Sequence, residues 1–141
     1  MSGALDGLVV LDLATFIAAP FCCTLLGEFG AEVIKVEQPG QGDDLRRLGH
    51  KPAEGISYVW LVESRNKKSI TCNLREPEGQ ALIGRLAANA DILAENFRPG
   101  TMEKWNLGNV DLCRVNPRLV MVRRRDTPPP LCPSRSRRGT I

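Results

Sequence analysis

Short apolar runs alternate with longer stretches of helical periodicity over most of the chain. Residues 8–13 form a near-continuous apolar run, as expected for a strand that is covered on both faces. Pro20 suits the first turn of a helix, and Phe21, Leu25 and Phe29 then recur at four-residue spacing. The chain therefore opens with a predicted strand, turn and helix.

The same alternation continues to about residue 122. Pro77 can open a second long helix. One face of that helix carries Leu82, Ile83, Leu86 and Ala87. Further strands are predicted at residues 32–37, 69–74, 90–95 and 119–122. Strands and helices that alternate in this way are typical of βαβ units, so we predict an α/β fold of three layers with a mostly parallel sheet.

The predicted topology also indicates where a ligand would bind. A doubly wound parallel sheet binds its ligands at the carboxyl ends of the strands. We therefore expect a site in the loops after Leu13, Glu37, Leu74 and Asn96.

Composition places the chain among soluble globular proteins. Hydrophobic residues make up 43% of the 141 positions and charged residues 25%. There is neither an apolar run of about 18 residues nor a signal-peptide pattern at the start, so we predict a cytoplasmic protein without a membrane partner. The five cysteines show no zinc or disulfide spacing and are predicted to be reduced thiols, most of them buried.

The positive charge is concentrated at the end of the chain. Residues 123–141 hold six arginines against Asp126, four of the ten prolines and no apolar period. Such a segment cannot bury enough surface to offset the entropy of ordering it, so it is predicted to be a disordered tail. We predict no nucleic-acid partner, because the tail has no aromatic residue to stack on a base.

Several common catalytic and cofactor motifs are absent. The sequence has no G-x-G-x-x-G after the first strand, no Walker loop, no H-E-x-x-H and no C-x-x-C. A nicotinamide enzyme, an ATP enzyme and a metal centre are therefore not expected. His50 is the one histidine and is interpreted as a solvated loop residue.

Seven sequence blocks stand in a fixed order along the chain. They are LDL at 11–13, AAPF at 18–21, LGEFGAEVIKVE at 26–37, GQGDD at 40–44, NKKSI at 66–70, PEG at 77–79 and ENFRPG at 95–100. In order and spacing these blocks resemble the opening of family III CoA-transferases of the CaiB/BaiF type. The agreement covers nearly all of residues 5 to 122, and several separate blocks make it specific.

The resemblance implies a fold and a reaction. Such enzymes move coenzyme A from an acyl-CoA to a small carboxylic acid, through mixed anhydrides and a thioester on an aspartate. They have a Rossmann-like large domain and a small domain, and two copies interlock as a homodimer. Residues 1–122 would be the N-terminal part of the large domain, and 123–141 would lie outside the family pattern.

The resemblance also implies contacts with coenzyme A or acyl-CoA. The corresponding positions are Ile17, Ala18, Gln38, Cys72, Asn73, Leu74, Arg75, Asn96, Phe97, Arg98 and Lys104. The cations among them suit the phosphates of the cofactor. Asn96 and Phe97 have an alternative role, a turn cap and a core residue. Formyl-CoA transferases have glutamine and arginine where this chain has Ile17 and Gln38, so the resemblance does not extend to oxalate and formate specificity.

No catalytic residue is assigned in this chain. The family's Gly-Asp motif, which carries the nucleophile, would lie past residue 141, and Asp43 with Asp44 is interpreted as a turn or a helix N-cap. We expect the tail to be a frame-shifted or truncated end of a longer coding sequence. Three functions stay open: part of a CoA-transferase, a non-catalytic CoA- or nucleotide-binding module, and an inactive truncated product.

Overall fold

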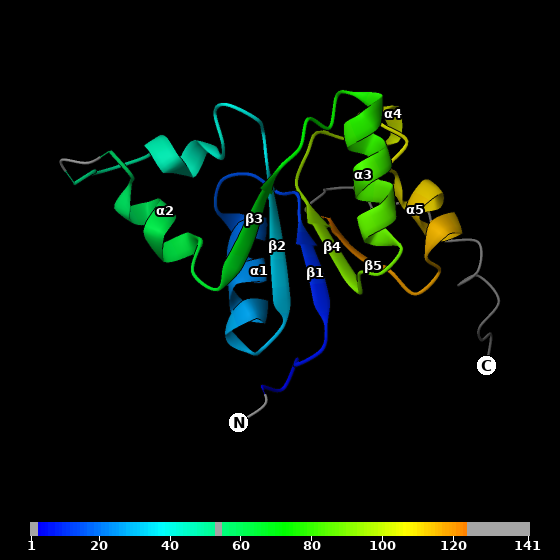
Figure 1. Cartoon of the computed structure of the whole chain (residues 1–141), viewed down its shortest axis with the longest axis horizontal. Helices are drawn as coiled ribbons and strands as arrows, with labels where there is room; N and C mark the ends of the chain where they lie inside the picture. Colours follow the sequence, from blue (N-terminus) through cyan, green and yellow to red (C-terminus); the bar gives the residue numbers. More distant parts are fainter. Residues whose placement is uncertain (1–2, 53–54, 124–141) are drawn as a thin grey trace.

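Five parallel strands form one sheet in the computed structural model, which describes residues 3–52 and 55–123 (Figure 1). The strands are β1 (Val9–Asp12), β2 (Glu32–Glu37), β3 (Lys67–Thr71), β4 (Ile92–Glu95) and β5 (Val120–Arg123). Their order across the sheet is β3-β2-β1-β4-β5, and every pairing is parallel. β2 and β3 are added on one side of β1, and β4 and β5 on the other side. The boundary between β1 and β4 is therefore the topological switch point, where ligands bind in such sheets.

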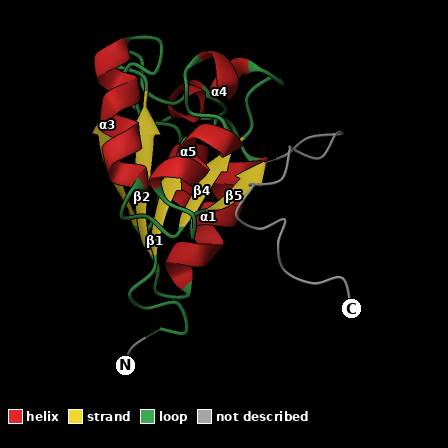
Figure 2. Cartoon of the chain, turned by 90° about the vertical axis from the view of Figure 1, so that its right-hand side faces the viewer, coloured by secondary structure: helices red, strands yellow, loops and turns green. Residues whose placement is uncertain are grey.

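Helices cover both faces of this sheet. The helix α1 (Ala18–Glu28) packs on one face, and α3 (Pro77–Ala87) and α5 (Asn109–Val115) lie on the other, as Figure 2 shows edge-on. The short helix α4 (Thr101–Lys104) lies on the α3 side, and its Met102 belongs to that side's core. The predicted α/β fold of three layers is thus confirmed.

The segment of chain that connects β2 to β3 forms a lateral extension beside the sheet. It consists of the 3-10 helix η1 (Asp44–Arg47) and the helix α2 (Tyr58–Glu63), which lie beyond the β3 edge of the sheet in Figure 1. Asp43 caps η1, because its side chain accepts a hydrogen bond from Leu45 N at 2.9 Å. The predicted N-cap role is therefore confirmed for Asp43.

Two hydrophobic clusters hold the layers together. Leu11 and Leu93 belong to the cluster under α3 and α5, whereas the neighbouring strand residues Val10 and Ala94 belong to the cluster under α1. Successive residues of a strand point to opposite faces, so each central strand serves both clusters. This is why residues 8–13 are apolar except for Asp12.

The apolar stripe of α1 faces away from the sheet. Phe21, Leu25 and Phe29 are 42%, 37% and 60% exposed, although their spacing is also typical of a core-facing stripe. The small residues Ala19 and Cys23 are buried, and Cys23 packs in the cluster on the sheet together with the partly buried Leu26. Small side chains at positions 19 and 23 bring the helix close to the strands, and Phe21, Leu25 and Phe29 remain outside.

Several predicted boundaries differ from the structure. The strand predicted at 69–74 is observed at Lys67–Thr71, because the chain turns at Asn73, whose side chain accepts a hydrogen bond from Arg75 N. The elements η1, α2, α4 and α5 were not expected. β5 includes Arg123, the first residue of the segment 123–141 that was predicted to be a disordered tail; residues 124–141 lie outside the described residues.

Two further expectations can be compared with the described residues. Cys22, Cys23 and Cys72 are free thiols, but Cys113 takes part in a disulfide, so the prediction of five reduced cysteines is wrong there. Within residues 3–52 and 55–123 no helix is long and apolar enough to cross a membrane.

Candidate functional site

A cavity of about 110 Å³ opens at the carboxyl ends of the central strands. It is lined by Leu13, Thr15, Val36, Glu37, Gln38, Cys72, Asn73, Leu74, Arg75, Phe97 and Trp105. These residues come from β2 and from the segments after β1, β2, β3 and β4. The topology therefore gathers segments that are far apart in sequence at the predicted edge of the sheet.

Six of the predicted contact residues line this cavity. They are Gln38, Cys72, Asn73, Leu74, Arg75 and Phe97. Asn73 holds the turn after β3 by accepting the hydrogen bond from Arg75 N at 3.1 Å. Arg75 is exposed, so its guanidinium group is accessible to an anionic ligand at the cavity mouth.

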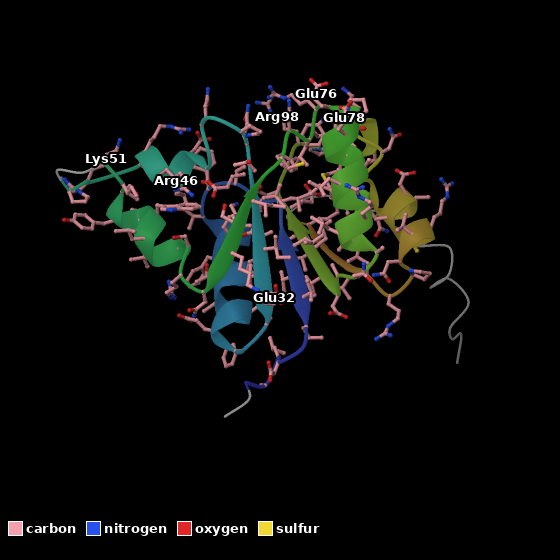
Figure 3. All side chains as sticks on the ribbon, in the orientation of Figure 1. Glu32, Arg46, Lys51, Glu76, Glu78 and Arg98 are labelled. Carbon is pink, nitrogen blue, oxygen red and sulfur yellow. The ribbon has the colours of Figure 1, made fainter. Side chains whose placement is uncertain are left out.

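The other five predicted residues do not line the cavity. Ile17 and Ala18 are exposed at the start of α1, and Arg98 and Lys104 are exposed beyond the end of β4. Figure 3 places Arg98 at the same end of the molecule as Glu76 and Glu78, which flank the start of α3. Arg98 and Lys104 each follow or precede a lining residue, Phe97 and Trp105, but do not line the cavity themselves.

Asn96 contacts the backbone of the loop after β1. Its amide oxygen accepts a hydrogen bond from Thr15 N at 2.9 Å, and its amide nitrogen donates to Thr15 O at 2.7 Å. Thr15 lines the cavity and Asn96 does not, so Asn96 holds a lining residue in place without lining the cavity itself. These contacts give Asn96 a structural role in the loop after β1, which differs from the predicted cap of the turn that follows Asn96.

An aromatic pair forms the wall on the α4 side. The rings of Phe97 and Trp105 meet edge to face, with centroids 5.2 Å apart and an interplanar angle of 78°. Phe97 N also donates to Glu95 Oε2 at 2.8 Å, which fixes the start of this segment. Trp105 was not predicted, because a lone tryptophan after a short helix gives no sequence signal for a site.

Glu37 is the one carboxylate among the lining residues. Its Oε2 accepts hydrogen bonds from Arg46 Nε at 2.6 Å and Asp43 N at 2.9 Å, and its Oε1 accepts from Arg46 Nη2 at 2.7 Å and from the Ser69 hydroxyl. Burial would raise the pKa of Glu37, but the bonds from Arg46, Ser69 and Asp43 N outweigh it and lower the pKa to about 2. Glu37 is therefore an ionised anchor for its neighbours.

A second buried network lies on the α1 side of the same edge. Lys35 is 2% exposed, and its Nζ lies 3.6 Å from Asp12 Oδ1 and 3.0 Å from Asp43 Oδ2. It also donates to Ala14 O, while Lys67 Nζ donates to Asp12 Oδ2 at 2.9 Å. The positive charges of Lys35 and Lys67 thus balance the negative charges of Asp12 and Asp43, and these contacts hold the loops after β1 and β2 in place.

Cys72 does not have the properties of a catalytic thiol. Burial raises its pKa, so the thiol stays protonated at neutral pH. Its Sγ donates to Gly79 O at 3.4 Å, at the start of α3. Cys72 therefore acts as a lining and packing residue.

The edge as a whole suits binding better than covalent chemistry. Besides Glu37, the buried carboxylates Asp12, Asp43 and Glu95 all take part in ion pairs, the last of them with Arg123. None of the described residues forms a cluster of metal-ligating side chains. The accessible groups are amides, aromatic rings and cations, which are suited to an anionic ligand with polar and apolar parts.

The chain has close relatives among known proteins. A family model described as CoA-transferase family III matches residues 5–125. The beta subunit of succinyl-CoA–L-malate CoA-transferase from Chloroflexus aurantiacus is 59% identical over 119 residues, which are 84% of this chain and 29% of that protein. Succinyl-CoA–D-citramalate CoA-transferase from the same organism is 55% identical over 84% of this chain and 30% of its own length.

The fold has a close counterpart in a solved structure. The crystal structure of a CAIB/BAIF family protein from Brucella suis matches with a TM-score of 0.81 and 38% identity, over 87% of this chain and 33% of that one. The chain thus spans about a third or less of the length of these three proteins.

Proposed function

The chain belongs to CoA-transferase family III, and from this premise we propose that the cavity at the carboxyl edge of its sheet binds a coenzyme A thioester. In the longer protein of which it would be a part, this binding serves transfer of CoA from an acyl-CoA to a small carboxylic acid. The observation that carries the proposal is the convergence of Gln38, Asn73–Arg75 and Phe97 on one cavity.

The residue types fit the parts of the ligand. Arg75, Arg98 and Lys104 would pair with phosphate oxygens at the mouth, because cations at a solvated rim suit multiply charged anions. Phe97 and Trp105 would contact the apolar part of the ligand inside. Ile17 and Ala18, exposed at the start of α1, would lie along the same ligand outside the cavity.

The covalent step requires a carboxylate beyond those described. Glu37 is the cavity's carboxylate, and both of its oxygens are already engaged by Arg46, Ser69 and Asp43 N. An attacking carboxylate needs a free oxygen lone pair aimed at the thioester carbon. We therefore propose that this chain contributes binding and that another part of the longer protein contributes the nucleophile.

The relatives suggest which substrates to test. The two Chloroflexus proteins are named for succinyl-CoA as one substrate and for malate or citramalate as the other. We propose succinyl-CoA as the donor and a hydroxylated dicarboxylic acid as the acceptor. The name "beta subunit" of one relative also supports an assembly of two or more chains in the working enzyme.

Isothermal titration tests the binding proposal. The 141-residue chain should bind CoA more tightly than NAD or ATP, since it lacks the glycine-rich phosphate loops of nicotinamide and ATP enzymes. Replacing Arg75 and Lys104 by alanine should weaken CoA binding about tenfold or more and reduce its salt dependence.

A matched control removes the same charge elsewhere. Lys68 and Arg114 are exposed, with side chains 72% and 76% accessible, and both lie outside the cavity lining. Their double alanine variant should bind CoA like the parent chain. An equal loss of CoA affinity in both double variants would mean that net charge alone, and not the position of Arg75 and Lys104, controls binding. If the parent chain does not bind CoA, the inactive alternative is favoured.

A further inference from the structure

Arg46 joins the lateral extension to the cavity without lining the cavity itself. Resting on the proposed CoA site, we propose that Arg46 is a positioning residue: through Glu37 it holds the loop that places Gln38 in the cavity wall. Four sets of contacts support this role, at Glu37, at Gly42, at Trp60 and at Ser57.

The first set is the pair between Arg46 and Glu37. Two nitrogens of the guanidinium group donate to the two carboxylate oxygens, at 2.6 and 2.7 Å. This is the bidentate geometry that fixes both groups in orientation as well as in distance. Glu37 Oε2 also accepts from Asp43 N, so the same carboxylate holds the far end of the loop at residues 38–43.

The second set shows that this loop is closed tightly over the pair. Gly42 N donates to Gln38 O at 2.9 Å, which closes the turn. Gly42 has a φ of +66°, and a Cβ placed there would come within 2.8 Å of both Glu37 Oε2 and Arg46 Cδ. The backbone of the loop thus lies directly against the ion pair, so the position of Gln38 depends on it.

The third and fourth sets tie Arg46 to α2. The Arg46 guanidinium carbon lies 4.1 Å from the centre of the Trp60 ring, in the geometry of a cation–π contact. Ser57, which caps α2, donates through its hydroxyl to Leu45 O at 2.7 Å and through its N–H to Arg46 O at 3.3 Å. Arg46 therefore contacts α2 on one side and Glu37 on the other. Figure 3 labels Arg46 between the sheet and the lateral extension.

These contacts argue for positioning rather than for direct binding. Arg46 is absent from the cavity lining, two of its guanidinium nitrogens donate to Glu37, and the guanidinium group lies over the Trp60 ring. The hydrogen bond with Glu37 also raises the pKa of Arg46, so its charge is fixed. What Arg46 can change is the order of loop 38–43, and with it the place of Gln38.

The test compares Arg46 with its sequence neighbour. Arg47 lies in the same 3-10 helix, pairs at the surface with Asp44 and donates to Gln41 O of the same loop, but it does not contact Glu37, so the comparison isolates the pair with Glu37. Arg46→Met should weaken CoA binding by about tenfold, as expected for loss of a coupled network, and Arg47→Met should leave it within about twofold. Arg46→Lys keeps the charge but not the bidentate contact, so it should recover part of the affinity.

A double-mutant cycle with Gln38→Ala separates positioning from other effects. If Arg46 acts through the loop, the effect of Arg46→Met should fall to about threefold or less once the Gln38 side chain is gone. A full and additive effect in both backgrounds overturns the proposal, and so does an Arg46→Met variant with unchanged affinity.

Amide exchange separates this proposal from the CoA site. The Asp43 N–H should exchange faster in Arg46→Met than in Arg47→Met, because its acceptor Glu37 is no longer held. If the parent chain binds no CoA, the proposed function fails. The exchange rate of the Asp43 amide then tests the positioning role of Arg46 by itself. Equal protection of the Asp43 amide in the two variants overturns the positioning role.

Discussion

At the scale of single residues, Glu37 links the acid stability of the chain to the order of the cavity. Its pKa is about 2 in the folded chain, below the ordinary value of 4.5. The unfolded chain therefore takes up a proton at higher pH than the folded chain does. The stabilisation is fully present above about pH 4.5 and is lost as the pH falls toward 2.

This gives a prediction for Glu37→Gln. The variant should be about 2 kcal/mol less stable at pH 6, because it loses the charge-assisted bonds from Arg46. The difference from the parent should shrink as the pH falls toward 2, where Glu37 itself becomes half protonated. Urea unfolding of both proteins at a series of pH values measures it. A constant difference across that range would contradict the assigned role.

Asn96 gives a second prediction at this scale. Because its amide both donates to and accepts from the Thr15 backbone, Asn96→Ala should destabilise the chain by about 1–2 kcal/mol. The exposed Asn89 is the matched control, and Asn89→Ala should change stability by less than about 0.5 kcal/mol. Thermal unfolding of the three proteins makes the comparison.

CoA affinity then separates the two roles of Asn96. The structural role predicts that Asn96→Ala lowers affinity only as far as the Thr15 wall loosens, so Asn96→Asp, which keeps the acceptor for Thr15 N, should bind better than Asn96→Ala. A stable Asn96→Ala chain that has lost CoA binding would instead indicate a direct contact.

Residue identity alone explains part of this site. Asp43 could be predicted as a turn or N-cap residue from its place after Gly42 in a loop, and it does cap η1. Its pairing with Lys35 could not, because that contact exists only once β2 and the loop after it fold together. The same holds for Arg46 and Trp60, which meet across two short helices.

At the scale of elements, α1 presents its large apolar residues to solvent. Phe21, Leu25 and Phe29 are one turn apart, and Ile17 before them is 51% exposed. A continuous stripe of this kind promotes self-association. The double variant Phe21→Gln, Leu25→Gln should therefore stay monomeric at higher concentration than the parent, with little change in its unfolding midpoint. Sedimentation velocity and urea unfolding measure the two quantities.

The opposite face of α1 provides the control. Cys23 is fully buried against the sheet, and burial raises its pKa to about 12. Cys23→Leu adds volume to a packed interface and should destabilise the chain by about 1–3 kcal/mol without reducing self-association. If this variant is neutral and the double variant unfolds, the orientation of α1 is not the one described.

The strands and the two long helices were easier to predict than the short helices. The segment 32–37 matches β2, and Pro77 does open α3, because a β-branched run and an N1 proline each act locally. The helices α4 and α5 span four and seven residues, too few for a clear apolar period. For α1 the period was correct but could not show which side of the helix meets the sheet.

At the scale of the whole molecule, topology supplies most of the site. The order of the parallel strands alone predicts that the loops after Leu13, Glu37 and Leu74 meet at one edge, and a cavity forms there. What the topology does not predict is the set of inner contacts that hold those loops. Examples are the hydrogen bonds between Asn96 and the Thr15 backbone and between Lys35 and Ala14 O, since each depends on side-chain packing between strands.

The last prediction concerns catalysis by the 141-residue chain as a whole. Covalent CoA transfer needs a carboxylate with a free oxygen near the thioester, in a site that excludes water. Among the described residues, the cavity's carboxylate Glu37 is engaged at both oxygens, and Asp43 is buried in an ion pair with Lys35. We therefore expect this chain to bind CoA without turning over succinyl-CoA and malate.

The assay offers the chain succinyl-CoA with several dicarboxylic acids and follows both CoA exchange and a hydroxylamine-sensitive protein adduct. The expected result is neither exchange nor adduct, with CoA binding retained. A longer family member that keeps the same first 122 residues is the positive control and should show both. Turnover by the 141-residue chain that persists when Glu37, Asp43 and Asp44 are each replaced would mean that another nucleophile exists. In that case the division between binding in this chain and chemistry elsewhere is wrong.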